Sequence, residues 1–282
     1  MIYKPYEIGE KKMVKKAVIL ARGLGTRMQK QAEVEIDEEN KELVDKGLKG
    51  MILFNERPFL DYVISNLLRA GFEDICLVIG PEHDIIRNYY SDVSKRNKDR
   101  FKISFAIQEK PIGTANAVLA AEKFSGDEEF IVLNSDNLYG DKALKILKDT
   151  KNKFVMPLYN LDSLIKKSNI EEERKRKFGI VQFQGKVLKK IIEKPENPDE
   201  FAQDGKIYVN MNIFKFGKEI FDACRNVKPG NKGEYLIVDA VSNIAKKQDF
   251  FVCPVDEGVL DLTSRKDIDS IKRYLEKEKL EF

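Results

Sequence analysis

The sequence predicts an α/β protein in which helices flank a mixed, mainly parallel β-sheet. Through the first half of the chain, short apolar runs rich in β-branched residues alternate with stretches of helical period. This alternation favours parallel strands joined by crossover helices. The 282 residues are enough to bury a sizeable core, and neither a Pro/Gly-rich linker nor an internal repeat divides them. We therefore expect a single domain over residues 1–282.

The expected elements of the first half follow from apolar runs and helical spacing. In the stretch 59–70, Leu60, Val63, Ile64 and Leu67 recur at the spacing of one helix face. The same reading places strands at 17–21, 75–80, 103–107, 130–133 and 154–158, and helices at 59–70, 85–90, 115–124 and 143–149.

The second half has a different pattern. Two apolar runs, 179–183 and 187–192, flank Gln184-Gly185-Lys186, which predicts a hairpin. A strand is expected at 207–216, and helices at 219–225, 234–246 and 268–280. The charged tracts 29–46 and 161–177 are expected to be mobile loops, and their most charged parts, 37–42 and 171–177, to be solvated loops or helix faces.

Composition excludes several classes of function. Lys and Arg exceed Asp and Glu by only three, and no basic stripe with interleaved aromatics occurs, so we expect no nucleic-acid partner. The single histidine, His83, argues against a histidine metal site or a Ser-His triad. The scattered Cys76, Cys224 and Cys253 predict buried free thiols in a reducing compartment. Residues 1–16 are polar and basic, unlike a signal peptide, and no apolar run is long enough to cross a membrane, so we expect a cytoplasmic protein.

The loop after the first expected strand has the features of a phosphate-binding turn. The apolar run 17–21 leads directly into Arg22-Gly23-Leu24-Gly25-Thr26-Arg27. Glycine at 23 and 25 allows backbone conformations that a Cβ forbids, so successive N–H groups can converge on an anion. A helix beginning near Thr26 would add the positive end of its dipole, and Arg27 supplies a planar cation. A dinucleotide fingerprint needs a third glycine where Met28 stands, and no Walker sequence is present.

Three further residues have the chemistry to act beside a bound phosphate. Lys49 lies 22 positions after Arg27, just ahead of an apolar run, and can meet the same phosphates as a point charge. Asp136 follows the run 130–133, at the strand end where open α/β sheets bind ligands. Asp261 stands within an apolar strand expected at 258–263, where a carboxylate is costly unless it is paired, hydrogen-bonded or bound to a metal. Two such carboxylates predict a Mg²⁺ site and metal-assisted phosphoryl or nucleotidyl transfer.

Two turns offer groups for the rest of a nucleotide and for a sugar phosphate. The Gln108 amide presents a donor and an acceptor side by side, which can pair with a base edge, and Gly113 lets the backbone approach a flat ring. Glu193-Lys194-Pro195 presents an acceptor and a cation together, which suit sugar hydroxyls and a sugar phosphate. Each segment alone also fits an ordinary turn.

Together these segments resemble the sugar-1-phosphate nucleotidyltransferases, such as the glucose-1-phosphate uridylyl- and thymidylyltransferases. The resemblance covers residues 17–267, with the motifs in the family's order. They are Gly-Leu-Gly-Thr-Arg at 23–27, Lys-Gly-Met at 49–51 with Arg57-Pro58, Gln108 with Gly-Thr-Ala at 113–115, Ser-Asp-Asn at 135–137, Phe178-Gly179, Glu-Lys-Pro at 193–195, the strand 210–214, the segment 233–239, and Asp261.

The resemblance implies a Rossmann-like fold of the GT-A type and Mg²⁺-dependent transfer of a nucleotidyl group from an NTP, UTP or dTTP favoured, to a sugar 1-phosphate. A phosphate nucleophile is already ionised, so no general base is needed. The nucleotide half would span about 17–150, the sugar-phosphate half about 151–265, and a C-terminal helix 266–282. The implied residues are Arg27, Lys49, Asp136 and Lys194 for catalysis; Ala21, Gly23, Gly25, Thr26, Gln108, Gly113 and Thr114 for the nucleotide; Gly179, Glu193, Lys194, Asn210, Asn212 and Glu234 for the sugar phosphate; and Asp136 and Asp261 for the metal.

The chain departs from the family pattern at several positions. Arg22 replaces a small residue, Leu48 stands where a proline precedes the lysine, and the gap before Lys49 is longer than usual. Asn212 replaces a sugar-side glycine, and Leu-Thr-Ser at 262–264 replaces a Thr/Val-Gly-Thr turn. The last two changes lie on the sugar side.

Two alternatives stay open at this stage, and the sequence argues against a third. One is a cytidylyltransferase acting on another phosphorylated acceptor, because a flipped Gln108 amide also suits cytosine. Another is a non-catalytic nucleotide or sugar sensor that has kept the fold. An inverting glycosyltransferase would want Asp-x-Asp at a strand end, whereas the one such sequence here, Asp267-Ile268-Asp269, begins the closing helix. The base, the sugar and the existence of a homo-oligomer are also open.

Overall fold

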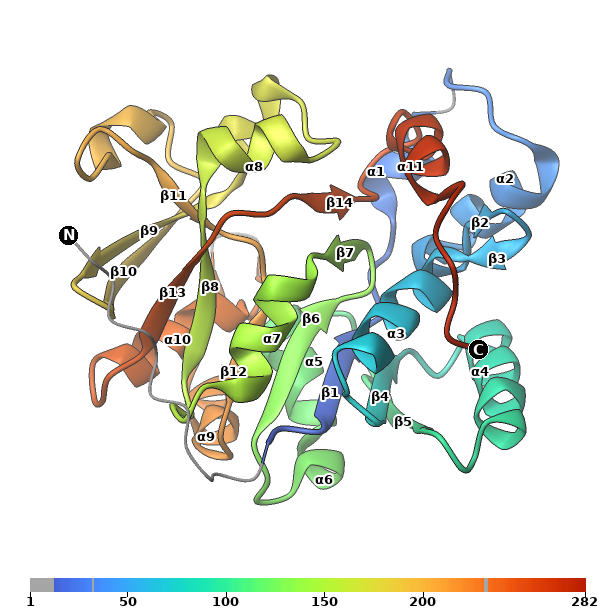
Figure 1. The fold of residues 1–282 in the computed structure, drawn as a ribbon, viewed down its shortest axis with the longest axis horizontal. Coiled ribbons are helices and arrows are strands. Elements are labelled where there is room, and N and C mark those ends of the chain that lie inside the picture. The colour runs from blue at the N-terminus through green and yellow to red at the C-terminus, as the bar shows by residue number, and fades with distance from the viewer. Residues whose placement is uncertain (1–12, 32, 231–232) are drawn as a thin grey trace.

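The computed structural model describes residues 13–31, 33–230 and 233–282, and they form the expected helix-flanked sheet (Figure 1). In this part of the chain ten strands join one sheet. The block β6–β1–β4–β5 is parallel, as is β8–β13, and the remaining pairings are antiparallel, so the fold-class prediction is confirmed. Across the sheet the strands are β11 (Tyr208–Asn210), β9 (Gly179–Gln184), β10 (Val187–Glu193), β13 (Phe251–Val255), β8 (Val155–Asn160), β12 (Phe214–Phe216), β6 (Phe130–Asn134), β1 (Lys16–Leu20), β4 (Asp74–Ile79) and β5 (Lys102–Ile107).

Alternate side chains of the strands enter two cores, one on each face of the sheet. In β1, Ala17 and Ile19 pack into one core and Val18 into the other, as the two-residue period of a strand requires. Figure 1 shows α3 and α7 in front of the sheet and α9 and α10 behind it. The first core receives residues of α3 (Phe59–Arg69), α4 (Asp84–Arg96), α7 (Asp141–Asp149), α8 (Leu161–Lys167) and α11 (Asp267–Leu275), and the second those of α5 (Thr114–Ala120), α9 (Glu219–Arg225) and α10 (Ile237–Ala245).

Helix α3 shows how the sequence sets an element's bounds. Pro58 precedes its first residue, where the missing N–H would have had no helical partner. Gly71 adopts a φ of 83° just beyond its end, and the N–H of Phe72 donates to the carbonyl of Leu67 over 3.0 Å. This left-handed glycine closes the helix. The expected range 59–70 is therefore met to within one residue.

The two charged tracts are not loops throughout, so that expectation was wrong. The first contains α2 (Glu38–Asp45), whose N-cap Asp37 accepts from the N–H of Asn40 over 2.8 Å, with Val44 buried. The second contains α8, capped by Asn160, and the 3-10 turn η2 (Glu172–Lys177). A local cap and one or two apolar anchors are enough to order a highly charged segment.

Two expected elements are broken in the structure. The strand 207–216 divides into β11 and β12, because Asn212 lies between them with a φ of 54°. The helix 115–124 divides into α5 and α6 (Glu122–Ser125) at Ala121. The last two expected helices keep their place, although α10 begins later and α11 ends earlier than predicted, and α4 runs on to Arg96.

Two short elements lie where the sequence placed them: α1 (Thr26–Gln29) begins at Thr26, and β14 (Val259–Asp261) lies within the expected strand 258–263. Other short elements were not predicted. Strand β7 (Asn137–Tyr139) pairs antiparallel with β14, and β2 (Leu53–Phe54) pairs with β3 (Arg57–Pro58) across a tight turn. The remaining unpredicted elements are β13, η1 (Lys49–Met51) and η3 (Pro198–Phe201). The β7–β14 pair matters for the site, because it brings the far end of the chain beside Asp136.

Two expectations from composition can be compared with the structure. In the described ranges we find no helix with the length and apolar character needed to cross a bilayer. The three cysteines are buried free thiols, as predicted, and burial raises the pKa of Cys76 and Cys224 to about 12. The expectation about residues 1–16 lies mostly outside the described residues.

Candidate active site

The loop after β1 combines one strained glycine with one open glycine. Gly25 has a φ of 64°, and a Cβ there would lie 3.3 Å from the Cα of Gly47. Gly23 has no positive φ, and a Cβ at its position would meet no other atom within 4 Å. The predicted special conformation is therefore right for Gly25 and wrong for Gly23. Gly23 instead leaves open space beside the loop, which a ligand could fill.

The helix expected at Thr26 is a single turn. α1 ends at Gln29, so its dipole contributes little to anion binding compared with a longer helix. Arg27 lies on this turn with an exposed side chain that lines a cavity. The cationic part of the predicted phosphate site therefore comes from side chains more than from a helix dipole.

Lys49 approaches the loop through a glycine contact that the sequence did not reveal. Gly47 has a φ of 73°, and a Cβ at this position would lie 2.7 Å from the carbonyl oxygen of Leu24. This close packing holds η1 against the loop after β1. As a result Lys49 lines the same cavity as Gly23 and Thr26, despite the long gap in sequence.

Two neighbouring cavities with lining residues in common lie along the C-terminal ends of the parallel strands. The first has a volume of about 410 Å³ and the second about 330 Å³. They share a common wall, so they form one cleft. The shared residues are Gly23, Leu24, Thr26, Lys49, Asn134 and Asp136.

The first cavity contains the residues expected to read a base. Gln108 is buried, and its Nε2 donates to the carbonyl of Gly113 and to Oδ1 of Asn116, each over 3.0 Å. Gly113 has a φ of 125°, and a Cβ there would lie 2.4 Å from the carbonyl oxygen of Tyr235. Close packing on Tyr235 therefore requires a glycine at position 113, which also lines the cavity. Ala21 and Thr114 line the same cavity.

Glu234 is not where the sequence placed it. It was expected on the sugar-phosphate side, but it lines the first cavity. The cause is the packing of the segment around Tyr235 on the turn 112–115, where the N–H of Tyr235 donates to the carbonyl of Ile112 over 2.9 Å. The boundary near residue 150 therefore does not separate the two cavities cleanly.

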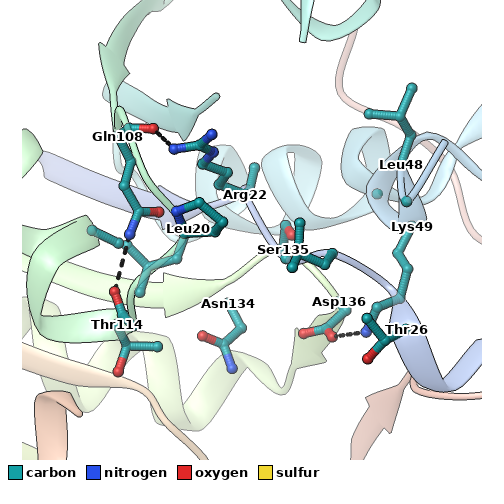
Figure 2. A pocket seen from close by; sticks show the side chains of 18 of the residues that line it. Leu20, Arg22, Thr26, Leu48, Lys49, Gln108, Thr114, Asn134, Ser135 and Asp136 are labelled. Carbon is teal, nitrogen blue, oxygen red and sulfur yellow. Dashed lines mark hydrogen bonds and ion pairs between the residues drawn. The ribbon is translucent and has the colours of Figure 1, made fainter. Parts of the chain in front are cut away.

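The two aspartates expected to bind metal meet in the second cavity, each beside a cation of the chain (Figure 2 shows the first pair). Lys49 Nζ lies 2.6 Å from Oδ2 of Asp136, and Nη2 of Arg174 lies 2.6 Å from Oδ2 of Asp261. The β7–β14 pairing brings the aspartates together, because Asp261 faces Asn137 and the next N–H, of Leu262, donates to the carbonyl of Asp136 over 2.9 Å.

Burial raises the pKa of Asp261, and the neighbouring charge of Asp136 raises it further, whereas Arg174 and the Thr263 hydroxyl lower it. Within the described residues no group of three or more His, Cys, Asp or Glu could hold a metal. Two carboxylates on one cavity nevertheless fit Mg²⁺, which takes its other oxygens from phosphates and water.

The rest of the second cavity is lined by polar and basic groups. The lining includes three residues that the resemblance assigns to the sugar phosphate, namely Lys194, Asn210 and Asn212. The N–H of Asn212 donates to Oδ1 of Asn210 over 2.8 Å, which supports the left-handed turn at residue 212. Arg27 also lies here.

Gly179 and Glu193 face each other across the β9–β10 hairpin but do not line either cavity. A Cβ at Gly179 would lie 2.7 Å from the Glu193 carboxylate, so the glycine makes room for that side chain. Desolvation raises the pKa of Glu193, and Lys194 opposes the effect. Their expected contact with a sugar stays a prediction.

Arg174 and Lys177 line the second cavity, although neither was among the residues that the sequence motifs indicated. They belong to the tract 171–177 that was expected to be solvated surface. Arg174 instead has a side chain only 13% exposed and bound to Asp261. The position of Arg174 opposite Asp261 depends on the fold of η2, and no local sequence pattern predicts this contact.

The cleft at the C-terminal edge of the parallel strands combines a glycine-rich loop, basic side chains and two carboxylates. This combination is typical of α/β proteins that bind nucleotides through their phosphates. Comparison with known families agrees with this class. The family model described as nucleotidyl transferase matches residues 16–278, and the chain belongs to this family.

Curated relatives and solved structures are similar over most of the chain. It is 26% identical over 264 residues to the UTP–glucose-1-phosphate uridylyltransferase AglF of Haloferax volcanii, covering 93% of this chain and 97% of that one. It is 27% identical over 231 residues to the bifunctional protein GlmU of Methanococcus maripaludis, covering 81% of this chain but 46% of that one. A UDP-glucose pyrophosphorylase solved with UDP-glucose has a TM-score of 0.72 at 20% identity, covering 95% of this chain and 100% of that one.

Proposed function

We propose that this protein transfers a nucleotidyl group from an NTP to a sugar 1-phosphate and releases pyrophosphate, with UTP or dTTP as the favoured donor. The relatives named for uridylyl transfer to glucose 1-phosphate support this choice of reaction. A phosphate oxygen of the sugar phosphate attacks the α-phosphorus in line as pyrophosphate leaves. The P–O bond to the acceptor forms and the bond to the pyrophosphate oxygen breaks, with no oxidant or general base required.

One observation carries the proposal: the two cavities meet at Lys49 and Asp136. The first cavity is lined by Gln108, which we propose reads the base, and the second by the cations Arg27 and Lys194. A donor with its base in the first cavity would extend its phosphates past the shared wall toward Arg27, where they would meet the phosphate of an acceptor in the second cavity. Such positioning, with stabilisation of phosphate charge, supplies most of the rate in phosphoryl transfer.

Each basic residue has a distinct role in this proposal. Arg27 binds the departing β,γ-phosphates, and Lys194 holds the phosphate of the acceptor. Lys49 lies 2.6 Å from Asp136 and is only 15% exposed, so it is poised at the junction. When a triphosphate enters, Lys49 exchanges its contact with Asp136 for the α-phosphate, which frees the carboxylate.

Asp136 and Asp261 would hold Mg²⁺ in the loaded site. The donor set fits, because two carboxylates and the phosphate oxygens are the ligands this ion prefers. Bound there, Mg²⁺ supplies positive charge beside the α-phosphate. In the structure Lys49 and Arg174 offset the charge of the same two carboxylates, so each aspartate has a cationic partner before the ion arrives.

The donor and the acceptor are bound mainly by different parts of the chain. Residues of about 17–150 supply most of the donor side and those of about 151–265 most of the acceptor side, with Glu234 as an exception. Glu193 and Gly179 recognise sugar hydroxyls next to Lys194. We also place the reaction in the cytoplasm, because three cysteines stay as free thiols.

The test is a matrix assay. The purified chain is mixed with Mg²⁺, each common NTP and several sugar 1-phosphates, and released pyrophosphate is measured. We expect release only when both substrates are present, with UTP or dTTP giving the highest kcat/KM. Binding of nucleotides without turnover in every combination would instead indicate a sensor, and strict use of CTP would indicate the cytidylyltransferase alternative.

A further inference from the structure

Arg22 stands in the phosphate loop where the family pattern has a small residue, and the proposed reaction gives it no role. Its side chain is only 7% exposed, and each of its three guanidinium nitrogens contacts an acceptor of the chain. Nε lies 3.4 Å from Oε1 of Glu82, and Nη2 lies 3.1 and 3.2 Å from the two carboxylate oxygens. Nη1 donates to the backbone carbonyl of Gln108 (Figure 2). A buried arginine with this forked pairing is held in one orientation.

These three residues join the ends of three neighbouring strands. Arg22 follows β1, Glu82 follows β4, and Gln108 follows β5, and the three strands are adjacent and parallel in the sheet. Backbone bonds tie the same ends, since the N–H of Gln108 donates to the carbonyl of Ile79 over 2.9 Å. Arg22 therefore fastens the base-reading segment directly to the phosphate loop.

The orientation of the Gln108 amide is fixed on its other side. Both Nε2 bonds go to the chain, to Gly113 and Asn116, each over 3.0 Å. The Oε1 atom is then the part of the amide that can accept from a base. The amide flip that would let this glutamine suit a different base edge is disfavoured, because it would place oxygen against two acceptors.

We propose that Arg22 is a positioning residue that fixes Gln108 and thereby sets the nucleobase selectivity of the donor site. The inference rests on the proposed function, in which Gln108 reads the base. Arg22 lines the first cavity, but its N–H groups point to Glu82 and Gln108, so it acts through Gln108. Loss of the arginine lets the segment after β5 move relative to the loop, and the base contact loosens while the phosphate contacts stay.

The experiment measures binding, which makes it independent of turnover. Dissociation constants are determined with Mg²⁺ for UTP, dTTP, CTP, ATP and GTP, and for inorganic tripolyphosphate, which has no base. In Arg22→Ala we expect the preferred nucleotide to bind about tenfold more weakly and the spread among the five to shrink to about threefold, with tripolyphosphate changed by less than about twofold. Arg22→Lys should lie in between, because lysine keeps the charge but not the fork.

Two further variants keep the result interpretable. Glu82→Gln weakens the fork at a half-exposed position and should reproduce the loss of selectivity even where Arg22→Ala fails to fold. Lys110→Ala removes an exposed charge two positions from Gln108 and should leave the dissociation constants of the nucleotides and of tripolyphosphate unchanged. Equal weakening of tripolyphosphate and nucleotides, or an unchanged spread, would overturn the proposal. Selective binding by the unaltered chain without pyrophosphate release would reject the proposed function and leave this test valid.

Discussion

Asp136→Asn tests the charge arrangement at the junction of the two cavities. The substitution keeps the size of the side chain and removes its negative charge. The Asp136 side chain is 24% exposed, and its Oδ2 lies 2.6 Å from Lys49 Nζ. In the loaded site this carboxylate would face Mg²⁺, because Lys49 has moved to the α-phosphate. Unit charges about 4 Å apart at an effective dielectric constant near 20 interact by about 4 kcal/mol, and partial exposure reduces this value. We therefore expect a loss of about 3 kcal/mol of transition-state stabilisation, or on the order of 100-fold in kcat.

The assay is steady-state pyrophosphate release at saturating Mg²⁺ with the best substrate pair from the matrix. We expect KM for the NTP to change by less than about threefold, because the loop and Arg27 hold the triphosphate in the ground state. Asp141→Asn is the matched control, since Asp141 is exposed and lines neither cavity of the cleft. A kcat within about threefold of the unaltered chain would refute the reasoning.

Three other outcomes follow from the structure. Arg174→Met leaves a buried carboxylate unpaired and should lower the free energy of unfolding in urea by about 3 kcal/mol, whereas the exposed Lys177→Met on the same turn should change it by less than about 0.5 kcal/mol; equal effects would contradict the ion pair. Gly25→Ala should cost about 1–2 kcal/mol of stability because of its positive φ, whereas Gly23→Ala should leave thermal stability unchanged and raise KM for the NTP; the reverse pattern would contradict the loop geometry. The native protein should not react with Ellman's reagent near pH 8, because burial raises two thiol pKa values to about 12, and all three thiols should react in denaturant.

The parts of the fold that were predictable are those with a repeating local signal. Strand β1 and helix α3 carry a continuous apolar run and a clear helical period, and both lie where expected. The hairpin β9–β10 has a glycine turn between two apolar runs. In each case the pattern that buries side chains is also the pattern visible in the sequence.

The parts that were missed depend on contacts between distant segments. Asn212 divides an apolar run into two strands that both pair with β8 but whose other partners are β9 and β6. Asparagine permits the positive φ at this position without requiring it. Arg174 sits in a run of charges that resembles solvated surface, and only the fold places it opposite Asp261. Short elements such as β7 are stabilised by their partner strand and have too few residues to show a period.

The candidate site divides in the same way. One cavity is lined by five of the motif residues, namely Arg27, Lys49, Asp136, Lys194 and Asp261, and their roles stay predictions. Glu234 lies on the other cavity, and Glu193 and Gly179 line neither. A motif indicates which residue types the chemistry needs, whereas the wall that each residue joins is decided by packing such as that of Tyr235 on Gly113.

The most direct test of nucleotidyl transfer is an oxygen-labelling experiment. The sugar 1-phosphate is prepared with ¹⁸O in its phosphate oxygens, the reaction is run with unlabelled NTP and Mg²⁺, and both products are analysed by mass spectrometry. Attack by the acceptor phosphate on the α-phosphorus predicts that all label appears in the NDP-sugar and none in the pyrophosphate. Label in the released pyrophosphate, or formation of inorganic phosphate in place of an NDP-sugar, would contradict it.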